Sequence, residues 1–191
     1  MSRYLIPILL VVLVLLSGLP IGCQKQPQED LESLLGYLDE VDPIMGEYLQ
    51  MMLSVTKSDK AIIDAVEYGD MGEIVEAITA HKNNVNHALQ CVDSGLLILE
   101  GLRPPIEAQD FHRLMIESLE KAQDGLLRWF YAVGVLYEVV CTRSMDMSTA
   151  PSVSEDEKQA RQLLREAQEI WTEVQKEFDD LIQILEERAK D

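Results

Sequence analysis

Residues 154–185, SEDEKQARQLLREAQEIWTEVQKEFDDLIQIL, carry the clearest helical pattern in the chain. Apolar side chains recur alternately four and three positions apart, which places them along one side of a helix. Ser154 and Glu157 form a capping-box pattern that predicts where this helix begins. A single apolar face has to be buried against other elements, so the segment predicts a helix within a larger helical core. The apolar positions are Ala160, Leu164, Ala167, Trp171, Val174, Phe178, Leu181 and Leu185.

Three earlier segments show the same apolar spacing and complete a set of four helices. They run from Glu29 to Val66, from Asp70 to Leu102 and from Met115 to Val140. Gly69, the turn Leu102–Pro105 and the polar stretch Met145–Val153 separate them. Because the connections are short and no strand pattern competes, the sequence predicts an all-α, antiparallel (up-down) four-helix bundle.

Two local features refine the predicted boundaries. Asp70 followed by Glu73 resembles a capping box and predicts the start of the second helix. Pro43 interrupts the first segment without shifting its apolar phase. A proline inside a helix costs about 3 kcal/mol outside the first turn, so we expect either a kink or a restart with Asp42 as N-cap.

The first 22 residues differ in composition from the rest of the chain. Arg3 is their one side chain charged at pH 7, and residues 8–16 form an unbroken apolar run. A positive start followed by a short apolar core is typical of a secretory signal. An uncleaved transmembrane anchor is the alternative, because nineteen uncharged residues of helix span about 28 Å.

The end of this segment, Leu19-Pro20-Ile21-Gly22-Cys23, resembles the lipobox of bacterial lipoproteins. In that family the cysteine receives a covalent lipid, and cleavage before it makes it the new N-terminus. Gly22 matches the small residue that the family has before the cysteine, whereas Pro20 departs from the usual leucine. The resemblance implies lipidation at Cys23 and a place in the bacterial cell envelope, outside the cytoplasmic membrane.

The chain therefore divides into residues 1–22 as signal peptide, 23–28 as lipidated cysteine with a short linker, and 29–191 as the helical bundle domain. Within the bundle, Leu102-Arg103-Pro104-Pro105 followed by His112 loosely resembles helical proteins exported by bacteria. This likeness brings no activity with it.

The overall charge narrows the range of partners. Sixteen lysines and arginines against 34 aspartates and glutamates give a net charge of −18. Such a charge excludes an ordinary nucleic-acid binder, which needs a basic surface, and favours cationic partners. Most carboxylates fall off the apolar stripes, so we expect them on solvated helix faces.

His81 occupies an apolar stripe position, and folding the first two helices about Gly69 places Asp59 level with it. We expect a buried, hydrogen-bonded Asp59–His81 pair, or else one or both side chains turned toward solvent. No serine or cysteine nucleophile joins them in the pattern, so we predict no catalytic residues. The histidines have no Glu-x-x-His spacing, and we predict no metal and no cofactor beyond the lipid on Cys23.

Two further pairs depend on how the helices lie against one another. Folding the last two helices about residue 149 or 150 places Trp129 level with Trp171. These rings then belong either to the core or to a ligand pocket. Cys91 and Cys141 lie about 37 Å apart along the rod, too far for a disulfide.

These observations predict a membrane-tethered exported lipoprotein with a non-enzymatic helical scaffold or protein-binding role. Its expected partners are the membrane, through the lipid anchor, and a protein of the envelope. The alternative is a small-ligand-binding or sensor bundle with a pocket near Trp129 and Trp171.

Overall fold

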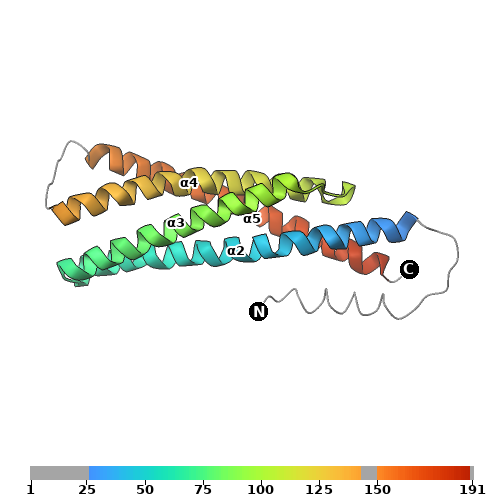
Figure 1. Cartoon of the computed structure of the whole chain (residues 1–191), viewed down its shortest axis with the longest axis horizontal. Helices are drawn as coiled ribbons and strands as arrows, with labels where there is room; N and C mark the ends of the chain where they lie inside the picture. The colour runs from blue at the N-terminus through green and yellow to red at the C-terminus, as the bar shows by residue number, and fades with distance from the viewer. Residues whose placement is uncertain (1–25, 143–149, 190–191) are drawn as a thin grey trace.

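The computed structural model describes residues 26–142 and 150–189, so the predicted signal segment and Cys23 lie outside the described residues. Four long helices are present: α2 (Gln26–Tyr68), α3 (Met71–Gly101), α4 (Gln109–Thr142) and α5 (Ala150–Arg188) (Figure 1). A short 3-10 helix, η1 (Ile106–Ala108), precedes α4. No strand occurs among the described residues, and the all-α prediction is confirmed.

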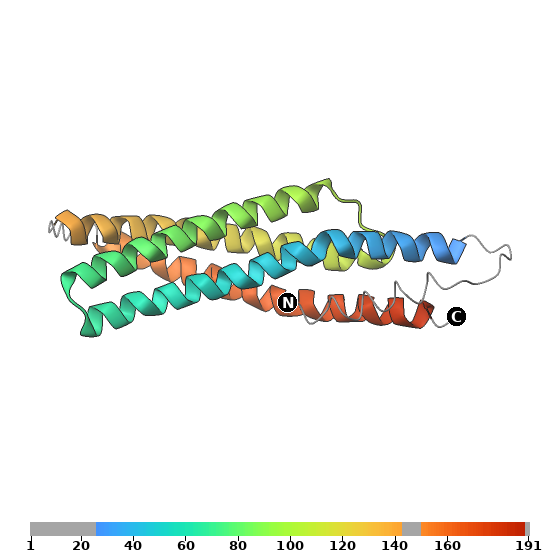
Figure 2. The ribbon, with the colours of Figure 1, turned by 60° about the horizontal axis from the view of Figure 1, so that its bottom comes forward.

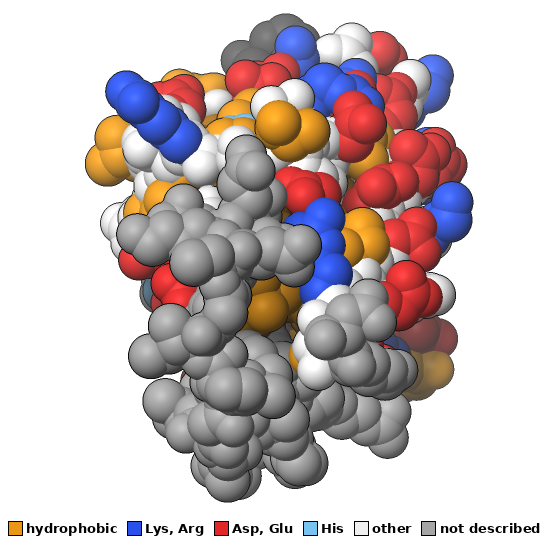
Figure 3. All heavy atoms as spheres, turned by 90° about the vertical axis from the view of Figure 1, so that its right-hand side faces the viewer, with side chains coloured by type: hydrophobic (Ala, Val, Ile, Leu, Met, Phe, Trp, Pro, Cys, Tyr) orange, Lys and Arg blue, Asp and Glu red, His pale blue; other side chains and the backbone are white. Residues whose placement is uncertain are grey.

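The four helices run alternately up and down a rod. The α2–α3 turn lies at one end, while α2 begins and α5 ends at the other (Figures 1 and 2). With 43 residues, α2 is about 64 Å long. The predicted antiparallel four-helix bundle is thus confirmed. Figure 3 views the end at which α2 begins and shows acidic side chains gathered along one side of it.

The core follows the apolar stripes predicted from the sequence. All eight stripe positions of α5, from Ala160 to Leu185, are buried. Burying each large apolar side chain is worth about 1.5–3 kcal/mol, so these stripes hold the bundle together.

Small residues let α4 and α5 approach closely. The Ser118 hydroxyl donates to the Ala167 carbonyl at 2.9 Å. A Cβ placed on Gly125 would lie 2.9 Å from Cγ of Leu164, closer than real carbon contacts. A glycine at this point is therefore a packing requirement of the α4–α5 contact.

The α2–α3 turn has the predicted capping box. The Asp70 carboxylate accepts hydrogen bonds from the backbone N–H groups of Gly72 (2.7 Å) and Glu73 (3.0 Å). In return the Glu73 carboxylate accepts from the Asp70 N–H at 2.9 Å. Three backbone donors at the start of α3 thus have partners, which defines where the helix begins.

The predicted start of the last helix is wrong. The helix α5 begins at Ala150, so Ser154 lies inside it and does not cap it. Pro151 falls in the first turn, where its missing N–H would have had no helical partner in any case. Residues 150–153 are therefore helical, although their composition is typical of a loop.

Two boundaries in α2 also differ from the expectation. The helix begins at Gln26, three residues before the predicted start at Glu29. It then continues through Pro43, so the predicted alternative of a restart with Asp42 as N-cap is wrong. Pro43 itself is exposed, and burial of Val41 and Ile44 on either side offsets its missing hydrogen bond.

The apolar stripes become more exposed to solvent toward the α2–α3 end of the rod, where the α2–α3 and α4–α5 pairs diverge (Figure 1). Val66 of α2 is 63% exposed and Leu136 of α4 is 37% exposed, although both occupy or extend the stripes. None of the helices in the described part of the chain is both long and apolar enough to cross a membrane.

Candidate functional site

A buried histidine lies near the α2–α3 end of the rod. Nδ1 of His81 is 2.8 Å from the hydroxyl oxygen of Ser58, which is also 3.0 Å from the carbonyl oxygens of Ser54 and Val55. Because Nε2 of His81 is buried without a hydrogen-bond partner, the neutral tautomer with its proton on Nδ1 avoids an unpaired buried N–H. In this tautomer the ring N–H donates to the Ser58 hydroxyl, whose own proton goes to a carbonyl.

The predicted Asp59–His81 hydrogen bond is therefore not formed. Asp59 instead accepts from the guanidinium of Arg161 at 3.2 and 3.3 Å. Adjacent residues of a helix point about 100° apart, so Ser58 faces α3 while Asp59 faces α5. The Arg161 guanidinium also lies over the Trp129 ring, 4.9 Å from its centroid, and that ring meets the His81 ring at 5.4 Å.

Electrostatics keep His81 neutral near pH 7. Burial lowers its pKa, the charge of Asp59 opposes that shift, and the charge of Arg161 adds to it. In the tautomer with its proton on Nδ1, the ring donates to Ser58 and does not take up the hydroxyl proton. What this cluster can do is hold α2, α3, α4 and α5 together in one arrangement.

The structure does not bring the two tryptophans together. Trp129 lies level with Arg161, which precedes Trp171 by ten residues, or about 15 Å along α5. Trp171 instead packs against Tyr48, with ring centroids 4.3 Å apart. Both tryptophans are buried in the core, at 8% and 4% exposure. Of the two alternatives, the rings thus take the core one, but at different levels. The predicted level was wrong because α4 and α5 fold about a point before residue 149, as the Ser118–Ala167 bond also shows.

The other two histidines each lie next to one titratable side chain. His112 pairs with the Tyr37 hydroxyl at 3.0 Å, and burial lowers its pKa. His87 lies 3.7 Å from the thiol of Cys91, whose pKa is raised by burial. Cys91 and Cys141 are both free, which confirms the prediction that they form no disulfide. Within the described residues, no three His, Cys, Asp or Glu side chains group closely enough to hold a metal ion.

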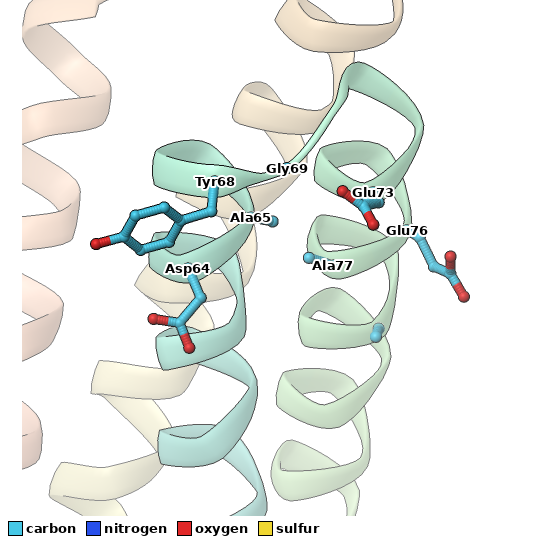
Figure 4. Close-up of a pocket in the computed structure, with 8 residues that line it drawn as sticks. Asp64, Ala65, Tyr68, Gly69, Glu73, Glu76 and Ala77 are labelled. Carbon is cyan, nitrogen blue, oxygen red and sulfur yellow. The ribbon is translucent and has the colours of Figure 1, made fainter.

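An open cavity of about 470 Å³ lies between α2 and α3 next to their turn (Figure 4). Its floor consists of small residues from both helices. Asp64 and Tyr68 project from the α2 side, and Glu76 projects from the α3 side. We call this feature the α2–α3 groove. Its lining residues are Asp64, Ala65, Tyr68, Gly69, Glu73, Glu76, Ala77 and Ala80.

The groove is acidic and has no cation of its own. Residues 61–80 contain five aspartates and glutamates and no lysine or arginine. None of the five makes an ion pair with a described residue, whereas Asp59, Glu107 and Glu166 elsewhere each pair with a cation. The sequence analysis did not single out this groove. Its sequence signal is the small residues Ala65 and Ala77 on the flank of each apolar stripe.

Comparison of the chain with protein-family models, curated proteins and solved structures finds no match. The features available for a functional assignment are therefore those of the chain itself. They are the buried Ser58–His81 cluster, which serves packing, and the α2–α3 groove, which faces solvent.

Proposed function

We propose that this chain is a membrane-tethered, exported lipoprotein whose helical bundle serves as a non-enzymatic scaffold or protein-binding rod. The support at the N-terminus is the lipobox-like sequence ending at Cys23. A lipid on Cys23 would hold the bundle in the bacterial cell envelope, outside the cytoplasmic membrane.

The observation that carries the proposal is that the two ends of α2 lie at opposite ends of the rod. The helix α2 begins at Gln26, three residues after Cys23, and ends at the opposite end of the bundle (Figure 1). A lipid on Cys23 would therefore hold one end of the rod at a membrane. The α2–α3 groove would then lie up to about 60 Å from that surface, in reach of other envelope proteins.

A binding role also fits the distribution of polar groups. The buried polar side chains Ser58, His81 and Ser118 bond to one another or to the backbone within the core. The unpaired charges lie on the surface, where they can meet a partner. The alternative of a small-ligand bundle has less support, because Trp129 and Trp171 are both buried in the core against different partners.

Intact-mass analysis of the chain purified from membranes of its native host tests the anchor. We expect loss of residues 1–22 and a gain in mass equal to a diacylglyceryl group, with or without a further acyl chain. The Cys23→Ala variant should keep residues 1–22 and gain no lipid. An unmodified wild-type chain that retains residues 1–22 would overturn the lipoprotein assignment.

A further inference from the structure

We propose that the α2–α3 groove binds a basic amphipathic helix of a partner protein. This inference rests on the protein-binding part of the proposed function, but it does not depend on the lipid anchor. It specifies where the contact lies and what chemistry the partner presents.

The shape of the groove suits a helix. Four of its eight lining residues, Ala65, Gly69, Ala77 and Ala80, are small. The longer side chains of Asp64 and Glu76 project from its two sides (Figure 4), and Glu73 lies beside Gly69 at the turn. Packed helix axes lie about 8–10 Å apart, and small side chains at the contact permit the shorter distances. The Tyr68 ring, 79% exposed at one end of the groove, offers an aromatic face to an apolar or cationic side chain.

The charge of the groove selects a basic occupant. Asp64 lies on one side and Glu76 on the other, and the two side chains point apart (Figure 4). Lysine and arginine can lay their apolar stems along an alanine floor while their charged ends reach carboxylates on either side. Glu73 already accepts the Asp70 N–H, which leaves Asp64 and Glu76 as the main carboxylates for a partner.

Other occupants fit less well. A second copy of this chain would bring a net charge of −18 to an acidic groove, and anionic lipid headgroups would be repelled in the same way. A cation-rich amphipathic helix would be attracted by the carboxylates and would bury its apolar side chains on the alanine floor. The groove extends over residues 64–68 of α2 and 73–80 of α3, at most roughly 12 Å. The contact is therefore small, and its affinity should depend strongly on salt.

A fluorescein-labelled peptide of about 20 residues tests the proposal, with leucine at three- and four-residue spacing and lysine elsewhere. Anisotropy titration with the purified full chain should show saturable binding that weakens at high salt. A peptide with glutamate in place of lysine should not bind. Binding of both peptides alike, or of neither, would overturn the proposal.

Charge-matched variants separate specific docking from general attraction to an acidic protein. The double variant Asp64→Asn with Glu76→Gln should bind the basic peptide about tenfold more weakly, the effect of losing two exposed charge pairs. Glu169→Gln with Glu173→Gln removes the same charge from exposed positions of α5 and should leave the affinity within about twofold of wild type. Equal weakening in both variants would contradict docking in the groove.

Methyl NMR of the chain labelled at alanine locates the contact. Adding the basic peptide should shift the methyl signals of Ala65, Ala77 and Ala80, while those of the core residues Ala122 and Ala167 stay in place. Shifts confined to other surfaces would refute the assignment. Self-association of the chain that Ala77→Arg abolishes would instead identify a second copy as the occupant. None of these readouts requires Cys23 to be lipidated, so their failure is distinct from failure of the anchor assignment.

Discussion

Lowering the pH should destabilise the bundle through His81. Burial lowers the pKa of this imidazole in the folded chain, whereas in the unfolded chain it is about 6.5. Above that pH both states hold the ring neutral, and the stability contributed by the neutral, Ser58-bonded ring is fully present. Between that pH and the lower folded pKa, only the unfolded chain takes up the proton, so stability falls as the pH falls.

The size of the effect follows from the linkage of a single proton. At about pH 5.5, one unit below the unfolded pKa, a ring that stays neutral in the folded chain costs at most about 1.4 kcal/mol of stability. Protonation in place would put a charged N–H at Nε2, which is buried without a partner and lies beside the Trp129 ring. The structure therefore favours a loss near the upper bound, and we expect about 1 kcal/mol.

The variant His81→Phe isolates this contribution. Phenylalanine keeps an aromatic ring against Trp129, and the Ser58 hydroxyl keeps its backbone carbonyl acceptors, so the variant should fold. Burial also lowers the pKa of His112, but that residue acts equally in both chains and cancels from the comparison. Urea unfolding followed by circular dichroism at about pH 7.5 and about pH 5.5 measures the difference.

We expect the wild type to lose about 1 kcal/mol more than His81→Phe over this interval. The control His87→Gln, which removes an exposed imidazole from the same helix, should keep the wild-type pH dependence. Equal pH dependence in the wild type and His81→Phe would show that His81 is not held neutral by burial, and the reasoning would fail.

Three further predictions follow from the packing and the caps. Gly125→Ala should lower the free energy of unfolding in urea titration by about 1–3 kcal/mol, because its new Cβ meets a leucine of α5. In the same helix, a Cβ on Gly134 meets nothing within 4 Å, so Gly134→Ala should raise the free energy of unfolding by about 0.5–1 kcal/mol. Asp70→Ala should cost about 1 kcal/mol by the same assay, since two backbone donors at the start of α3 lose their acceptor, and an unchanged value would contradict the capping box. Denatured, unreduced chain should take up alkylating reagent at both Cys91 and Cys141, and an intrachain-linked peptide pair in mass spectrometry would refute the helix arrangement.

The sequence alone determined the helices and the faces that they bury. The eight apolar positions of α5 are all buried. They could be predicted because the face on which a helical residue lies depends only on the 3.6-residue repeat of the local backbone, so the spacing of apolar residues along the chain shows which face is buried. The capping box at Asp70 could be predicted for the same reason, since both of its partners lie within one turn. That Cys91 and Cys141 stay unpaired was also predictable, because the predicted separation is far larger than any uncertainty in the turns.

Only the tertiary structure decided which side chains meet across helices. The level of Trp129 against α5 depends on where the α4–α5 connection ends and on how Gly125 packs against Leu164, and a shift of a few residues along the rod changes every partner. His81 bonds to Ser58 rather than Asp59 because a rotation of one helical position redirects a side chain by about 100°. The α2–α3 groove could not be predicted either, since it depends on two helices placing their alanines on facing sides at the same height. Local geometry sets helical phase, whereas axial register and rotation between helices are set by packing over the whole rod.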